Sequence, residues 1–362
     1  MDVKIELFVF YELGGELTYE EIDAALENFS QRSSDEFILE EDKGTPDYVR
    51  YPQPVIFRPA SGFARGEDSH PVTGKIYKTG DLSLRITIDP GVDNLKELNE
   101  YLSENHSLKE EVRDHCRDIY RRLADEFSFD ISREEFYRRG MSEVYPVFCV
   151  SGFNNEAEKL IENKQREITA LLNRQYRRRN FSREQIEATI SDSISFYRQD
   201  CSVIHWNGSV LLNDDDRFSD VLLILELANI QFLKLKLYDD YINNYLSDYM
   251  DDIDRFLKFR LLLHVPGLRN KITEITRLKV ELEKVTEILD NHEKYFGSWY
   301  LARIYSQACR VFEIDRWREV MEKRLEKVTE LYSMLEEEVN RSRMLFLNVL
   351  TLMLFILWFV IG

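Results

Sequence analysis

Cysteine is scarce in this sequence. The 362 residues include four cysteines, which lie far apart and form no Cys-x-x-Cys pair and no cluster with histidine. This usage excludes a disulfide framework and gives no sign of a structural zinc site. We therefore expect reduced, mostly buried thiols at Cys116, Cys149, Cys201 and Cys309.

Catalytic motifs are also lacking. The sequence has no Gly-x-Ser-x-Gly motif, Walker loop, Gly-x-Gly-x-x-Gly motif or His-Glu-x-x-His motif, and its six histidines have no neighbours that suggest a triad or a metal pair. We predict that the protein is not an enzyme. One alternative stays open, which is an unrecognised site around His205, Asp192 and Asp200.

Basic residues are outnumbered. Lysine and arginine total 48 against 66 acidic residues, so the net charge is −18, which disfavours nucleic acid as a partner. Clustered carboxylates suit hard divalent cations, so Mg²⁺ or a similar ion is the cofactor that this composition suggests. The candidate ligands are Asp214, Asp215, Asp216, Asp251 and Asp252. The other interpretation is a solvated acidic helix surface.

Turn signals are frequent near the N-terminus, where short elements alternate. A strand is expected at residues 3–11, followed by a helix that a Thr18–Glu21 capping box begins. Residues 72–78 and 82–89 predict a hairpin, and residues 202–212 predict another that turns at Asn207-Gly208. Helical spacing of apolar residues follows at 95–102, 108–127, 155–176 and 182–196, with a strand at 144–150.

Helix breakers are almost absent after Gly208. Only Pro266, Gly267 and Gly297 interrupt residues 209–361, which predicts helices at about 219–263, 268–296 and 298–361. Apolar residues three and four apart predict a coiled-coil seam in the last two helices. The seam residues are Ile275, Leu278, Leu282, Val285 and Leu289, then Met321, Leu325, Val328, Tyr332, Leu335 and Val339.

The last segment, residues 344–361, has no charged residue, glycine or proline. Its 18 residues approach the roughly 20 that a helix needs to cross a bilayer, so we predict a single transmembrane helix. Arg341 and Arg343 favour a cytoplasmic N-terminal side. Asn348 and Thr351 share a face of this helix, which indicates self-association or, in a ring of subunits, a pore lining.

The helical half resembles a known family. Residues 309–343, followed by the apolar tail, are similar to the C-terminal region of the "required for meiotic nuclear division" family through Ile314, Arg316, Val320, Met321, Leu325, Glu330 and Leu331. Trp299 and Tyr305, with Ala228 and Gln231 in residues 225–238, extend the likeness. The resemblance implies an organellar or bacterial membrane protein. The first 200 residues show no clear match to this family.

The architecture is also similar to CorA-type magnesium channels, which have an α/β head, an acidic helical hairpin and a very long helix that reaches the membrane. The likeness implies an oligomer in which Asn348 and Thr351 lie near the pore. However, the Gly-Met-Asn signature and a second span are absent from this sequence.

These observations predict an α+β cytoplasmic head (residues 1–212), a coiled-coil stalk of long helices (213–342) and a transmembrane tail (343–362). We expect a noncatalytic, tail-anchored oligomeric scaffold or tether in a bacterial inner membrane or its organellar equivalent. Its partners would be the membrane, further copies of the chain and a cytoplasmic protein. The alternative is a CorA-like divalent-cation channel or sensor with one span per subunit.

Overall fold

The chain forms two compact units. In the computed structural model, the first unit joins Met1–Lys234 with Asn291–Ile314, and the second joins Leu235–Asp290 with Asp315–Gly362. The structure describes residues 1–27, 30–32, 53–59, 62–66, 68–127, 141–153, 156–177, 180–258, 268–295 and 299–361. The finer expected division at residues 212 and 342 stays a prediction.

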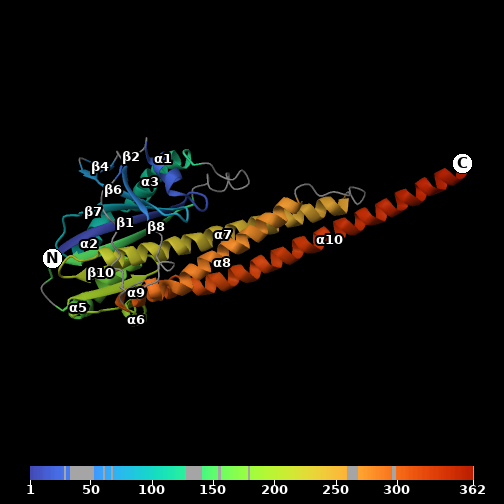
Figure 1. Ribbon diagram of the computed structural model, residues 1–362. Helices are drawn as coiled ribbons and strands as arrows, with labels where there is room; N and C mark the ends of the chain where they lie inside the picture. The colour runs from blue at the N-terminus through green and yellow to red at the C-terminus, as the bar shows by residue number, and fades with distance from the viewer. Residues whose placement is uncertain are drawn as a thin grey trace. The chain divides into compact units, whose positions relative to one another are not determined.

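An eight-stranded sheet forms the centre of the first unit (Figure 1). Its order is β2-β3-β6-β7-β1-β8-β10-β9, and neighbouring strands are antiparallel except for β8 and β10, which are parallel. The strands are β1 (Asp2–Glu12), β2 (Ser30–Arg32), β3 (Val55–Pro59), β6 (Val72–Ile76), β7 (Asp81–Ile88), β8 (Glu143–Ser151), β9 (Asp200–His205) and β10 (Gly208–Asn213). A separate pair joins β4 (Phe63–Arg65) to β5 (Asp68–His70).

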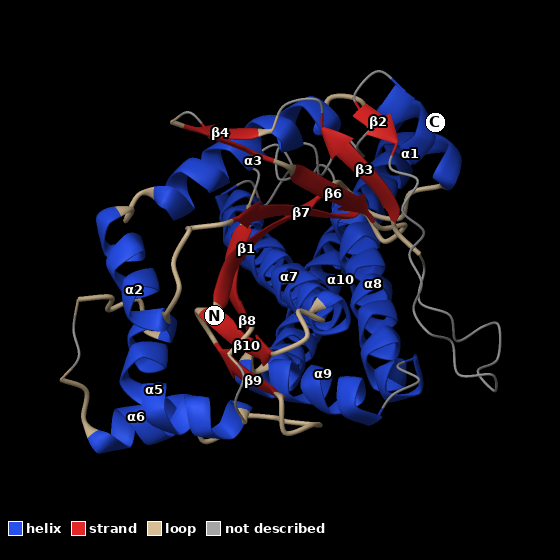
Figure 2. Ribbon diagram, turned by 90° about the vertical axis from the view of Figure 1, so that its left-hand side faces the viewer, coloured by secondary structure: helices blue, strands red, loops and turns tan. Residues whose placement is uncertain are grey.

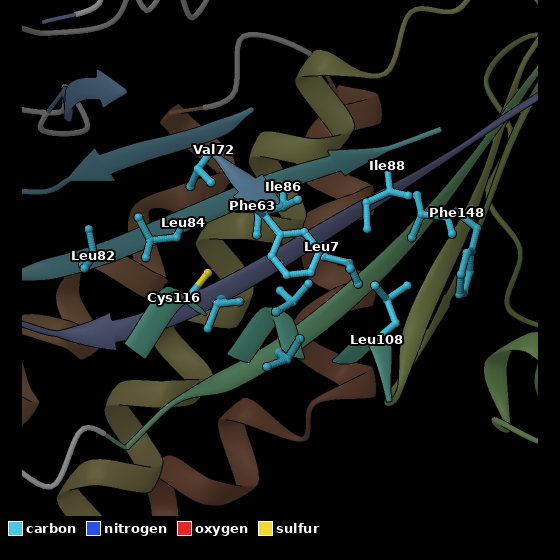
Figure 3. Close-up of a cluster of buried hydrophobic side chains, with 14 of the residues drawn as sticks. Leu7, Phe63, Val72, Leu82, Leu84, Ile86, Ile88, Leu108, Cys116 and Phe148 are labelled. Atoms are coloured by element: carbon cyan, nitrogen blue, oxygen red, sulfur yellow. The ribbon is translucent and has the colours of Figure 1, made fainter. Parts of the chain in front are cut away.

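Side chains on one face of the sheet form the main hydrophobic core (Figure 3). Alternate residues of β1, such as Leu7 and Val9, point to this face and meet Leu84 and Ile86 of β7. This face is covered by helices (Figure 2). They are α1 (Tyr19–Glu27), α2 (Leu95–Glu104), α3 (Leu108–Ala124) and α5 (Ala157–Leu172). A short helix, α6 (Arg183–Ile190), follows α5 in the chain.

The opposite face of the sheet is covered as well. The beginning of α7 (Ser219–Lys258) and the short helix α9 (Trp299–Val311) lie on that side (Figure 2). The Phe312 ring, just after α9, contacts Tyr145 of β8 and Phe232 of α7 with ring centres 5.5 and 5.8 Å apart. Because both faces are buried there, the second half of β1 is an unbroken apolar run at residues 7–11. Its first half still alternates, with Lys4 and Glu6 next to Val3 and Ile5.

The second unit is built from long helices. The remainder of α7 packs with α8 (Leu268–Tyr295) and with α10 (Ile314–Ile361). The seam residues of α8 and α10 that the structure describes are buried within this single chain: Ile275, Leu278, Leu282, Met321, Leu325, Val328, Tyr332, Leu335 and Val339. The side chains of Val285 and Leu289 lie outside the described residues.

Several local predictions are confirmed. The Thr18 hydroxyl accepts the Glu21 backbone N–H, and the Glu21 carboxylate accepts the Thr18 N–H, so the capping box is present. Both hairpins form. The second hairpin turns one residue earlier than expected, because His205 pairs with Gly208 and leaves Trp206 and Asn207 as the loop.

The third predicted helix is wrong in one respect, because the chain breaks it into α9 and α10. Glu313, between the two helices, has a left-handed backbone with φ of 52°. No glycine or proline marks this break. The break places the Phe312 ring among aromatic side chains of the first unit, where it is 1% exposed. Tertiary burial therefore decides where the helix is interrupted.

Candidate functional site

The most unusual surface of the chain is the end of α10. The large apolar residues there are all exposed, from Met344 at 62% to Phe359 at 77%. This is the one helix, among the described residues, that is long and apolar enough to cross a membrane, and its most apolar stretch is not buried at all. Soluble proteins rarely leave so large a continuous apolar surface uncovered.

Two polar side chains interrupt this apolar surface. Thr351 donates its hydroxyl hydrogen to the Leu347 carbonyl oxygen at 2.7 Å, so its polar group is satisfied within the helix. Asn348 lies one turn earlier and is exposed. The amide of Asn348 is therefore the polar group best placed to bond to a neighbouring helix.

Upstream of the apolar segment, charged groups organise the interior of the second unit. Asp252 is buried, and its carboxylate forms an ion pair with the ammonium group of Lys271 in α8 at 2.8 Å. The Asp248 carboxylate pairs with the same ammonium group at 3.1 Å. Burial works to lower the pKa of Lys271, but hydrogen bonds to the two carboxylates outweigh it and raise that pKa. These ion pairs join α7 to α8.

The five candidate metal ligands are divided between the two units. Asp214 accepts the Phe153 N–H at 2.7 Å, Asp215 pairs with Arg217, and Asp216 pairs with Lys4 at 2.8 Å, all in the first unit. Asp251 and Asp252 belong to the second unit. Within the described ranges, no three His, Cys, Asp or Glu side chains are arranged to hold a metal ion. Metal binding by these carboxylates stays a prediction.

The three residues of the enzyme hypothesis have separate partners. The Asp200 carboxylate accepts the Phe196 and Tyr197 N–H groups, and Asp192 pairs with Arg310 at 2.9 Å. His205 accepts the Asn207 N–H at Nδ1, and burial lowers its pKa. The contacts of Asp200 and His205 stabilise local turns, whereas the Asp192 ion pair joins the turn after α6 to α9. The three side chains therefore have different partners.

A set of buried charges that the sequence pattern did not predict lies between α7 and the sheet. Lys75 of β6 approaches Glu226 of α7 to 2.6 Å, and the Tyr77 hydroxyl donates to the same carboxylate at 3.2 Å. Further along α7, Lys234 lies 3.2 Å from Asp81 and 3.6 Å from Glu12.

Burial raises the pKa of Glu12 to about 8, although Lys234 opposes the shift. A carboxyl in this position holds a proton near neutral pH. The signal in the sequence was the pair of charges Glu226 and Lys234 inside an otherwise apolar helical run.

The described chain thus combines an α+β N-terminal part with a long C-terminal helix whose end is exposed and apolar. The family described as "Uncharacterized protein MJ0711, N-terminal domain" matches residues 2–219, and the chain belongs to this family. The match covers the part of the sequence in which we found no clear family resemblance.

Two relatives extend this result. Over 243 residues the chain is 24% identical to "Uncharacterized protein MJ0711" of Methanocaldococcus jannaschii. The matched region covers 67% of this chain and 68% of the relative. It is 22% identical over 151 residues to "Sporulation protein RMD1" of Saccharomyces cerevisiae, which covers 41% of this chain and 35% of the relative. This second similarity supports the meiotic-division family resemblance. No solved structure matches the chain.

Proposed function

We propose that this protein is a noncatalytic membrane scaffold, anchored through the end of α10, with the α+β unit on the cytoplasmic side as the part that recruits a partner protein. The observation that carries the proposal is that every large apolar side chain from Met344 to Phe359 is exposed. A folded chain gains little by leaving such a surface in water, so another apolar phase is the natural environment for it.

The dimensions and energies of the segment suit a bilayer. Its 18 residues span about 27 Å as a helix, against roughly 30 Å of hydrocarbon. Thirteen of these residues are Leu, Ile, Phe or Val, and together they favour insertion by about 4 to 8 kcal/mol. Helical backbone bonds satisfy the peptide groups, as the hydrocarbon interior requires.

Charge supports the proposed orientation. Arg341 and Arg343 come directly before the apolar segment, so basic residues flank this end of it. Arg341 also pairs with Glu338 at 2.9 Å. Basic residues next to a span favour its cytoplasmic end.

Self-association is part of the proposal, and the exposed face of the apolar segment is the surface that we propose for it. The heptad residues described in α8 and α10 are already buried within one chain, so a second copy would have to use other residues. The exposed face that carries Asn348 and Thr351 is the candidate, because a polar amide in hydrocarbon is stabilised by a partner helix.

Flotation with phosphatidylcholine vesicles tests the anchor. One arginine near the middle of a span costs about 2.5–3.5 kcal/mol, so two arginines should cancel most of the insertion energy. We expect the full chain to float with the vesicles and the double variant Leu352→Arg/Phe355→Arg to stay in the aqueous fraction. The control is Met334→Arg, which adds charge at an exposed position of the same helix before the apolar segment. A full chain that stays in the aqueous fraction, or a double variant that floats, contradicts the anchor.

Native mass spectrometry in mild detergent tests the oligomer and separates the scaffold from the cation channel. We expect a small oligomer for the scaffold. With one span per subunit, a monomer or dimer cannot enclose a pore, whereas a ring of four or more would favour the channel and call for a Mg²⁺ flux assay. A monomer would remove self-association from the proposal.

A further inference from the structure

A polar pocket lies in the first unit, away from the apolar segment. Its volume is about 380 Å³, and it lies between the turn after α6 and one face of α9. The turn contributes Ser191, Asp192, Ser193 and Ile194, and α9 contributes Arg303, Ser306, Gln307 and Arg310.

Both walls of this pocket are held against the edge strand β9. Ile194 and Ser202 exchange two backbone hydrogen bonds of 2.9 and 2.8 Å, which fix the turn. On the other wall, Tyr300 packs against Phe196 with ring centres 5.3 Å apart, and the Tyr305 hydroxyl donates to Gln231 of α7. The pocket is therefore part of the folded unit.

The lining is rich in hydrogen-bond donors. Arg303 and Arg310 stand seven residues apart, which is two turns of α9, so their guanidinium groups share one face with Ser306 between them. Ser191 and Ser193 add two hydroxyl groups from the facing turn. The only carboxylate in the lining is Asp192, so the pocket carries a net positive charge in a protein whose overall charge is −18.

The two arginines differ in how they are engaged. Arg310 pairs with Asp192 at 2.9 Å, and both side chains are more than half exposed. Arg303 lies over the Trp299 ring, 5.5 Å from its centre, and makes no ion pair within the part of the chain that the structure describes. The charge of Arg303 is therefore free to meet an anion.

Gln307, in the wall of the pocket, has an unsatisfied polar group of its own. Arginine only donates, so the Gln307 amide must turn its oxygen toward Arg310. This leaves the Gln307 nitrogen buried without a hydrogen-bond partner among the described atoms. Leaving a buried donor unpaired is costly, and functional sites are where proteins tolerate that cost.

We propose that this pocket binds a small phosphate-bearing ligand. Paired guanidinium groups match phosphate oxygens in geometry and charge, and the serine hydroxyls supply further donors. The volume exceeds that of a bare phosphate ion and leaves room for an attached organic group. This site is separate from the proposed membrane anchor.

Asp192 makes the proposal unusually easy to refute. Its carboxylate pairs with Arg310 and would repel an incoming phosphate, so it competes with the ligand. Replacing Asp192 with asparagine should therefore tighten phosphate binding. If the residues around the pocket had only a structural role, the same change would weaken the site or leave it unaltered.

The experiment titrates the full chain in mild detergent with inorganic phosphate, adenosine monophosphate and adenosine. Trp299 fluorescence is the readout, because Arg303 covers that ring, and Trp299→Phe identifies its signal among the four tryptophans. Arg303→Gln and Arg310→Gln should each weaken binding about tenfold or more. Arg183→Gln, at an exposed arginine of α6 outside the pocket, is the matched control.

We expect saturable binding of the nucleotide, no response to adenosine, and tighter binding in Asp192→Asn. Binding of inorganic phosphate alone with the same dependence on Arg303 and Arg310 would support the site and assign it to the free ion. The proposal is overturned if neither phosphate compound binds, if adenosine binds equally well, or if binding survives in the double arginine variant.

Discussion

Lys75 and Glu226 provide the sharpest test of how the sheet holds α7. The Lys75 ammonium lies 2.6 Å from the Glu226 carboxylate, with side chains that are 14% and 2% exposed. The Tyr77 hydroxyl donates to the other carboxylate oxygen at 3.2 Å. The perturbation is Lys75→Met, which keeps the length of the side chain and removes its charge.

The expected loss follows from the burial of the remaining partner. Without Lys75, the Glu226 carboxylate keeps the Tyr77 hydroxyl but loses its paired charge in a site that water barely reaches. Removing one member of a buried ion pair typically costs about 3–5 kcal/mol. For a unit of this size, each kcal/mol lowers the melting temperature by roughly 2–4 °C, so a fall on the order of 10 °C is expected.

Thermal unfolding of the full chain in mild detergent measures this loss within a double-mutant cycle. The second single variant is Glu226→Met, and Lys75→Met/Glu226→Met should recover much of the stability, because two apolar side chains leave no charge unpaired. Lys96→Met is the control, since Lys96 pairs with Glu100 at 3.8 Å on the surface and should cost less than about 1 kcal/mol. Equal effects of Lys75→Met and Lys96→Met, or additive single changes in the cycle, would refute the reasoning.

Two other changes probe the first unit. Burial raises the pKa of Glu12 to about 8, so the folded state holds a proton that the unfolded state releases near pH 4.5. The free energy of unfolding should therefore fall as pH rises from about 4.5 to 8. This part of the fall should vanish in Glu12→Gln. Melting curves of the two proteins across that range check the prediction, and parallel pH profiles would contradict it. Gly74→Ala places a methyl group 2.2 Å from a ring carbon of Phe57 and should cost about 1–3 kcal/mol. Adding Phe57→Leu should restore part of the loss, and an unaltered melting temperature in Gly74→Ala would show that the ring moves freely.

The proposed anchor and the proposed pocket would give the chain two independent attachments. The apolar end of α10 suits a bilayer through its length and composition, whereas the pocket beside α9 suits a phosphate group through its charges. If both exist, a soluble phosphorylated ligand would bind the first unit while the second unit carries the membrane segment. The anchor and the pocket are tested with different variants, so one proposal can fail while the other stands.

The sequence alone determined the features that depend on local periodicity. The apolar run before Gly362, the Thr18–Glu21 capping box and the two hairpins follow from spacing and turn chemistry, which neighbouring residues carry by themselves. It also indicated the heptad pattern of α8 and α10, because the spacing of apolar residues sets which face of a helix is buried.

Only the tertiary structure decided which surfaces meet. The break at Glu313 has no local signal, since the burial of the Phe312 ring against β8 and α7 fixes it. The seam could equally have faced a second chain, and folding closes it within one chain because α7 and α8 supply the partner surfaces. Likewise, Ser193 lies more than a hundred residues before Arg303 and Arg310 in the sequence, and folding brings the turn and the helix to one pocket. Such contacts join residues distant in sequence, so no local pattern encodes them.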